Sequence, residues 1–157
     1  MRVGTGYDVH AFDSTRPLII GGVTIRDTDG LAGHSDADVL CHAIGDALLG
    51  AAALGDLGSV FPATDEWRNA SGAQLLREIA VRLQGSGWQI VNIDSTVIAE
   101  APRLSEHVAR MATNISEALD IEASPVSVKA TSPDGLGFTG RGEGIAAMAS
   151  VLIEPLV

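Results

Sequence analysis

The sequence has little cysteine, few aromatic residues and little positive charge. Its 157 residues include one cysteine, 4% aromatic residues, and 10 Lys and Arg against 20 Asp and Glu. The lone Cys41 excludes a disulfide within the chain, which is typical of a reducing compartment. The net charge of −10 disfavours nucleic acid and anionic membranes as partners. An anionic substrate would therefore need local help from metal ions, helix N-termini or a few basic side chains.

Long apolar runs are also missing. No stretch reaches the roughly 20 residues of a membrane-spanning helix, and the N-terminus shows no secretory signal pattern. We therefore expect a cytoplasmic protein that binds neither membranes nor nucleic acid.

Apolar residues, by contrast, are abundant and regularly spaced. Hydrophobic residues make up 46% of the chain, enough for one packed domain spanning 1–157. The periodicity predicts strands at 2–11, 18–25, 88–99, 126–130 and 145–153, and helices at 36–53, 74–84 and 105–119. This order, ββααβαββ, predicts an α+β fold in which helices cover one face of a mixed sheet. The nearly continuous apolar character of 145–153 indicates cover on both faces, so we expect an oligomer.

Three residues suggest a metal site. Asp8 and His10 lie two apart on the first strand, so their side chains share one face, and His42 lies on the helix 36–53. One carboxylate and two imidazoles suit zinc, and three protein ligands leave the open position typical of catalytic sites. Asp38 and Asp46, one turn before and after His42, are candidates to orient its imidazole. Spacing alone leaves open that these are ordinary polar side chains.

His34 and Ser35 precede the same helix. Structurally, Ser35 is predicted to cap the helix, with Asp38 three residues later completing a capping box. Functionally, a helix N-terminus suits a phosphate, and a histidine and a hydroxyl beside it can donate hydrogen bonds to a reacting phosphoryl group. Both interpretations remain open from the spacing.

The segment 129–143 combines basic, acidic and hydroxyl side chains with four glycines. It is no P-loop, because the Gly-Lys-Ser/Thr ending is missing. Either it is a long connecting loop or it binds a ligand, and its composition favours the functional interpretation.

Five blocks in order carry a family resemblance. They are Gly-x-Gly-Tyr-Asp-Val-His at 4–10, His-Ser-Asp-Ala-Asp at 34–38, Asp-Ala-Leu-Leu-Gly-Ala-Ala-Ala-Leu-Gly-Asp-Leu-Gly at 46–58, Phe-Pro-x-Thr-Asp at 61–65, and Lys-Ala-Thr with Gly-Phe-Thr-Gly-Arg-Gly-Glu-Gly at 129–144. Over almost the whole chain the sequence resembles the 2-C-methyl-D-erythritol 2,4-cyclodiphosphate synthases of the non-mevalonate isoprenoid pathway. The resemblance implies an α+β subunit in a homotrimer, with active sites between subunits.

The implied reaction is that of a phosphorus-oxygen lyase. In 4-diphosphocytidyl-2-C-methyl-D-erythritol 2-phosphate, the 2-phosphate attacks the β-phosphorus, CMP leaves and a cyclic diphosphate forms. Because nucleophile and leaving group belong to one molecule, the enzyme mainly folds the substrate into line and neutralises charge.

The resemblance also assigns roles. It implies Zn²⁺, one per subunit, on Asp8, His10 and His42, with His34 and Ser132 as catalytic residues. Asp134 matches the ligand of a second ion, Mg²⁺ or Mn²⁺, that bridges the substrate diphosphate. The substrate-binding positions are Asp8, Val9, His10, His34, Ser35, Asp56, Leu57, Gly58, Phe61, Pro62, Ala63, Thr64, Asp65, Ala99, Glu100, Ala101, Pro102, Arg103, Leu104, Ser105, Thr131, Ser132, Pro133, Asp134, Phe138 and Arg141.

Within that set, the cytidine end is expected along 99–105 and 131–134, and the erythritol end at 56–58 and 61–65. Arg141 is also expected near the threefold axis, where family members hold isoprenoid diphosphates. The chain departs from the family in having Asp134 for a frequent glutamate, Ser132 for a threonine and Arg103 for a lysine. The shorter Asp134 side chain would bind the second ion through water.

Two other functions fit the same residues. A zinc phosphohydrolase would place water in the open position, with Asp56 or Asp65 as its base, and would release inorganic phosphate rather than CMP. A non-catalytic trimer would bind isoprenoid diphosphates alone, and an intact His34 and Ser132 argue against it.

Overall fold

The computed structural model describes residues 1–156, and its strands form one large and one small sheet. The large sheet has the order β4-β1-β7-β5-β6, and β2 pairs with β3. The strands are β1 (Arg2–Asp13), β2 (Leu18–Ile20), β3 (Val23–Arg26), β4 (Gly30–Leu31), β5 (Trp88–Ile98), β6 (Val126–Thr131) and β7 (Gly144–Pro155). The helices are α1 (Val39–Ala52), α2 (Leu57–Val60), η1 (Asp65–Trp67), α3 (Gly72–Gly85), α4 (Val108–Leu119) and α5 (Gly137–Gly140).

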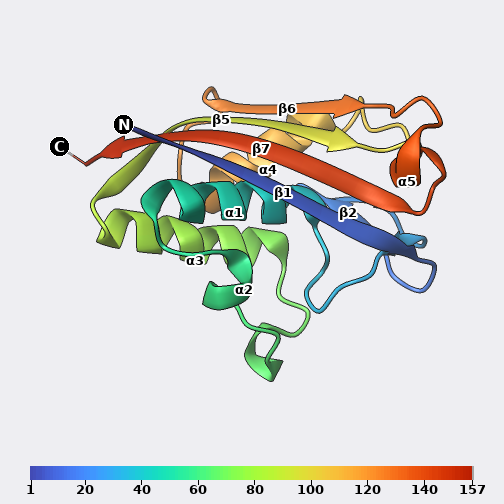
Figure 1. The fold of residues 1–157 in the computed structure, drawn as a ribbon, viewed down its shortest axis with the longest axis horizontal. Helices are drawn as coiled ribbons and strands as arrows, with labels where there is room; N and C mark the ends of the chain where they lie inside the picture. The colour runs from blue at the N-terminus through green and yellow to red at the C-terminus, as the bar shows by residue number, and fades with distance from the viewer. Residues whose placement is uncertain (157) are drawn as a thin grey trace.

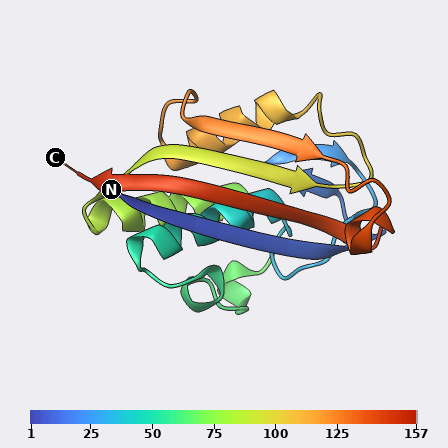
Figure 2. The ribbon, with the colours of Figure 1, turned by 45° about the horizontal axis from the view of Figure 1, so that its top comes forward.

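The large sheet is mixed. β1 and β5 both run antiparallel to β7, whereas β5 and β6 are parallel and joined through α4. The helices α1, α3 and α4 lie on one face of this sheet, as Figures 1 and 2 show. This arrangement confirms the predicted α+β fold with a mixed sheet and helices on one face.

The core lies between α1 and the centre of the sheet. Twelve of the fourteen residues of α1 are buried, so the helix is apolar on nearly every side, as expected of a central element. Its approach to β1 is close because Gly4 and Gly6 face it. A Cβ on Gly6 would lie 1.9 Å from the carbonyl oxygen of Ala43 and 2.8 Å from the nitrogen of Ala47. This contact places the middle of β1 directly against α1.

The predicted start of the first helix was wrong. Asp38, not Ser35, is the N-cap of α1, and its carboxylate accepts from the Cys41 N–H at 3.1 Å. The same fully buried carboxylate accepts from Gly21 N–H at 2.9 Å and Gly22 N–H at 2.7 Å. One carboxylate satisfying three donors is a stronger cap than a serine hydroxyl, so the helix begins at Val39.

Other boundaries also differ from the predicted ones. The predicted strand 18–25 is a hairpin, because Gly21 and Gly22 turn the chain with φ of 57° and 69°. Helix α3 begins two residues early, at Gly72, with Ser71 as its cap. Helix α4 begins at Val108 rather than at 105. The short elements α2, η1 and α5 lie in segments predicted to be loops.

The face of the sheet opposite the helices remains exposed. Val3, Tyr7 and Val9 on β1 are 70%, 52% and 42% exposed, and Met148 on β7 is 55% exposed. Tyr7 pairs with Met148 in the register of the two strands. This face is therefore partly apolar and uncovered within one chain.

Candidate metal centre and active site

Asp8, His10 and His42 meet where β1 crosses α1. Asp8 Oδ2 lies 2.9 Å from His10 Nε2 and 3.1 Å from His42 Nδ1. The two imidazole nitrogens are 3.2 Å apart. Alternation along β1 puts Asp8 and His10 on one face, as predicted, and this face is the one that packs against α1. The close contact of Gly6 with α1 brings His42 near both residues. One ligand atom from each residue therefore converges on one point.

The outer nitrogens of both rings are already occupied. His10 Nδ1 donates to the carbonyl oxygen of Ala32 at 2.6 Å, and a carbonyl can only accept. His42 Nε2 lies 3.1 Å from Ser35 Oγ. When His42 Nε2 also carries its proton, His10 Nε2 and His42 Nδ1 each direct a lone pair towards the other and towards Asp8. A cation bound between the three groups would stabilise this arrangement.

The donor set fits zinc. Tetrahedral zinc with bonds of about 2.0–2.1 Å holds its ligand atoms about 3.3 Å apart, close to the three separations above. Ala32 and Ser35 supply the outer hydrogen bonds that fix the imidazole orientations at metal sites. The earlier candidates for that role were wrong, because Asp38 accepts from backbone N–H groups and Asp46 accepts from Leu57 N–H at 2.8 Å.

The protonation of the triad reflects its pairing. Burial opposes the charged form of Asp8, but hydrogen bonds with His10 and His42 outweigh burial and hold the pKa of Asp8 well below its usual range. For His10, burial lowers the pKa, whereas the hydrogen bond and charge of Asp8 raise it, and the net shift is upward.

His34 and Ser35 lie beside the triad. Both line a cavity of about 340 Å³ together with Asp8, His10, His42, Asp46, Leu57, Gly58, Phe61, Ala63, Trp67 and Leu75. His34 Nε2 donates to the Thr64 carbonyl oxygen at 2.7 Å, which leaves Nδ1 as the ring nitrogen for a ligand. Ser35 is not a helix cap, and its hydroxyl contacts His42 instead.

Several predicted residues do not line this cavity. Val9 is on the opposite face of β1, as alternation requires. Asp56 caps α2 by accepting from Ser59 N–H at 2.8 Å. The predicted residues Pro62, Thr64 and Asp65 are exposed on the loop around it. Conversely, Trp67 and Leu75 were missed; they add an apolar wall, with Trp67 packed edge-on against Phe61 at 4.8 Å between ring centroids.

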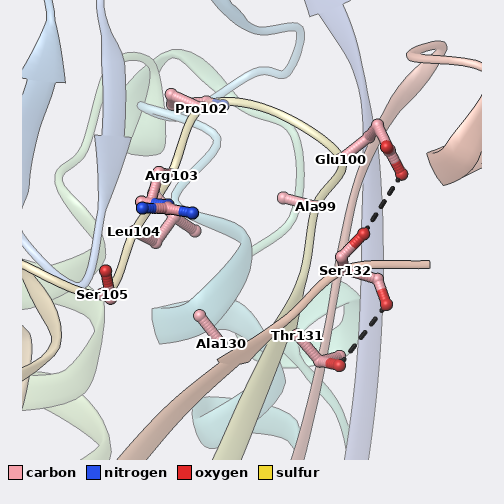
Figure 3. Close-up of a pocket in the computed structure, with 9 residues that line it drawn as sticks. All are labelled: Ala99, Glu100, Pro102, Arg103, Leu104, Ser105, Ala130, Thr131 and Ser132. Atoms are coloured by element: carbon pink, nitrogen blue, oxygen red, sulfur yellow. Dashed lines mark hydrogen bonds between the residues drawn. The ribbon is translucent and has the colours of Figure 1, made fainter. Parts of the chain in front are cut away.

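A second cavity lies at the carboxyl ends of β5 and β6. Its volume is about 500 Å³, and it is lined by Ala99, Glu100, Pro102, Arg103, Leu104, Ser105, Ala130, Thr131 and Ser132. Figure 3 shows the Ser132 hydroxyl pointing to Glu100, to which it donates at 3.3 Å. All but Ala130 were assigned to the substrate by resemblance, whereas Ala101, Pro133 and Asp134 do not line this cavity.

The loop after Ser132 is folded back by hydrogen bonds. Asp134 N–H donates to Ser132 Oγ at 3.0 Å, and Gly135 N–H donates to Glu100 Oε2 at 3.1 Å. Asp134 itself has a left-handed φ of 52° and is exposed. Further along, Phe138 lies in α5, and exposed Arg141 pairs with Glu143 at 2.6 Å.

The two cavities share no lining residue. The first is built on β1 and α1, the second on β5 and β6, and β7 runs between β1 and β5. The residues assigned to one substrate are thus divided between two places on a single chain.

Comparison with known proteins identifies the family. The YgbB family model matches residues 1–154. The chain belongs to the YgbB family. A Syntrophomonas wolfei relative named 2-C-methyl-D-erythritol 2,4-cyclodiphosphate synthase is 56% identical over 98% of this chain and 99% of its own length. A Salinibacter ruber protein of the same name is 55% identical, again over 98% and 99%. The resemblance based on the five sequence blocks is confirmed.

Solved structures of two similar proteins share the fold of this chain. The bifunctional IspDF from Campylobacter jejuni matches with a TM-score of 0.95 and 42% identity, over 99% of this chain and 42% of the bifunctional chain. The Plasmodium falciparum IspF in complex with CDP matches with a TM-score of 0.87 and 33% identity, over 99% and 97%.

Proposed function

We propose that this chain converts 4-diphosphocytidyl-2-C-methyl-D-erythritol 2-phosphate to 2-C-methyl-D-erythritol 2,4-cyclodiphosphate and CMP, as a phosphorus-oxygen lyase. The observation that carries the proposal is the Asp8–His10–His42 cluster, with two imidazole nitrogens facing one carboxylate in a cavity also lined by His34. Family membership at 56% identity over nearly the whole chain supports it.

We assign Zn²⁺ to this cluster. When bound, the ion supplies Lewis-acid polarisation of a phosphate oxygen and a fixed point for the substrate. The chain would do the rest by positioning. His34 Nδ1 would face a phosphoryl oxygen; donating to it while Nε2–H keeps its bond to Thr64 uses the doubly protonated ring. Leu57, Gly58 and Phe61 would hold the erythritol end.

The second cavity would take the cytidine end. Ser132 would turn its hydroxyl from Glu100 to the diphosphate as charge develops there. Asp134 would hold Mg²⁺ or Mn²⁺ through water, because its carboxylate is one methylene shorter than glutamate. This second ion would offset repulsion between a diphosphate and an acidic protein.

We further propose a homotrimer with active sites between subunits. Two features support the trimer. The cavity at the metal cluster and the cytidine cavity share no lining residue. The sheet face with Val3, Tyr7, Val9 and Met148 is partly apolar and uncovered. A neighbouring copy would cover that face and bring its cytidine cavity to the metal centre. Arg141 would then approach the threefold axis, where an isoprenoid diphosphate is a candidate ligand.

We expect this reaction to take place in the cytoplasm. No helix within residues 1–156 has both the length and the apolar character to cross a membrane.

The test is phosphorus NMR of the purified protein with substrate, Zn²⁺ and Mg²⁺. Two coupled signals of a cyclic diphosphate with stoichiometric CMP are expected from the wild type. His42→Ala should form neither, whereas His107→Ala is a suitable control because His107 makes no side-chain capping bond. Inorganic phosphate in place of CMP would establish the phosphohydrolase. Unchanged substrate with an intact zinc-loaded trimer would indicate a binding protein.

A further inference from the structure

Arg16 reaches the loop that surrounds the metal centre from outside the candidate site. It lies in the polar turn between β1 and β2 and is half-buried. Its Nη1 donates to the carbonyl oxygen of Gly33 at 2.6 Å, and its Nη2 donates to the carbonyl oxygen of Ser35. The planar guanidinium thus bridges the carbonyl groups of Gly33 and Ser35, the residues before and after His34.

The loop held in this way, residues 32–35, contacts both candidate imidazole ligands. Ala32 accepts from His10 Nδ1, and Ser35 Oγ contacts His42 Nε2. Gly33 packs against the His10 ring so closely that a Cβ there would lie 3.3 Å from Cε1. A movement of this loop would therefore turn His10, His34 and His42 together.

Other bonds restrain parts of this loop. Asn69 N–H donates to the His34 carbonyl oxygen at 3.0 Å, and Asp36 N–H, in the same peptide group as the Ser35 carbonyl, donates to the Ala70 carbonyl oxygen at 3.0 Å. Each of these bonds ties one peptide group of the loop to a neighbouring segment. Arg16 instead ties the Gly33 and Ser35 carbonyl groups to each other, because its two N–H donors have a rigid geometry in the guanidinium.

We propose that Arg16 is a positioning residue for the metal centre and for His34. Its role rests on two directed N–H donors and not on its charge. The kinetic part of this inference depends on the proposed cyclase function, whereas the part that concerns metal affinity does not.

A charge-based role makes a different prediction. Arg16 could attract an anionic substrate, in which case a lysine would serve as well and loss of charge would raise KM at constant kcat. A lysine ammonium, however, cannot present two coplanar donors to two carbonyl groups. Arg16→Lys therefore separates geometry from charge.

The experiment compares Arg16→Lys, Arg16→Ala and the control Arg26→Gln. Arg26 is also half-buried and donates to a loop carbonyl, that of Asp29, at 2.9 and 3.3 Å. Zinc affinity would be measured by chelator competition, and kcat and KM by CMP release. Losing a group that contacts a metal ligand directly costs about 10-fold to 100-fold. Because Arg16 acts through the loop that carries such groups, we expect zinc affinity and kcat to fall about 10-fold, at the lower end of this range, in both Arg16 variants, with KM little changed. Arg26→Gln should match the wild type.

Added guanidinium provides an independent readout. It should restore part of the zinc affinity and kcat of Arg16→Ala but leave Arg16→Lys unchanged, since the lysine fills the vacated space. Wild-type zinc affinity and kcat in Arg16→Lys would overturn the proposal, as would a raised KM alone. If the wild type bound zinc but released no CMP, the proposed function would fail, and zinc affinity would still decide the role of Arg16.

Discussion

Replacing Gly6 with alanine should open the metal centre by forcing β1 away from α1. A Cβ at this position would lie 1.9 Å from the Ala43 carbonyl oxygen, and real Cβ atoms essentially never approach another atom within 3.0 Å. To remove this clash, the backbones of β1 and α1 must move apart locally by at least 3.0 − 1.9 Å, about 1.1 Å. Neither clashing atom belongs to a flexible side chain that could rotate out of the way. Asp8 and His10 follow Gly6 on one side of the shift, and His42 precedes Ala43 on the other.

That shift is large compared with what a zinc site tolerates. Metal–ligand distances vary by only about 0.2 Å, so Gly6→Ala should weaken zinc binding by about 10-fold or more. Overpacking of this kind also costs roughly 1–3 kcal/mol of unfolding free energy. Zinc competition titrations and urea unfolding of the metal-free chain would measure the two effects separately.

Gly50→Ala, in the helix α1 that packs against Gly6, is the control for adding a methyl group to a glycine. A Cβ at Gly50 meets nothing within 4 Å, so this variant should keep its zinc affinity and gain up to about 1 kcal/mol from helix propensity. Zinc affinity in Gly6→Ala within twofold of the wild type, together with unchanged unfolding, would refute the argument that the glycine contact sets the ligand positions.

Three further outcomes follow from buried or paired groups. Asp38→Ala should lose about 3 kcal/mol in urea unfolding, since the cap of α1 is worth about 1 kcal/mol and buried donors left unpaired add about 1–3 kcal/mol; a loss under about 1 kcal/mol would contradict this. Zinc affinity should fall as pH falls through the pKa of His10. Burial lowers this pKa, but the hydrogen bond and charge of Asp8 outweigh burial and raise it above the ordinary 6.5. Protons should therefore begin to compete with zinc above pH 6.5, and zinc titrations in which competition begins only below pH 6.5 would contradict this. Burial, followed by the charge of Asp38, raises the pKa of the Cys41 thiol. A disulfide reagent should therefore modify this buried thiol only as fast as the chain unfolds. Rapid modification of the native chain would contradict this.

Local patterns predicted the grouping of Asp8, His10 and His42 well. Alternation along β1 correctly placed Asp8 and His10 on one face, and helical spacing placed His42 on α1. The convergence of the two elements was not predictable from spacing, because it depends on Gly4 and Gly6 letting the strand and helix approach.

The errors arise where contacts distant in sequence decide local structure. Ser35 has good capping chemistry, but Asp38 caps α1 because its carboxylate also satisfies Gly21 and Gly22 in another element. Asp46 was a reasonable partner for His42 by helical spacing, yet its carboxylate accepts from Leu57. Likewise, nothing in the turn 13–17 indicates that Arg16 reaches the carbonyl groups of a loop 17 residues later.

The most direct test of the central claim is to run the reaction in water labelled with oxygen-18. In the proposed reaction the nucleophile is the substrate's own 2-phosphate, so neither CMP nor the cyclic diphosphate should contain solvent oxygen by mass spectrometry. Zinc removal should stop product formation, and restoring zinc should recover it in the wild type but not in His42→Ala. Solvent oxygen in a phosphate-containing product of the first turnover would show attack by water and contradict the account.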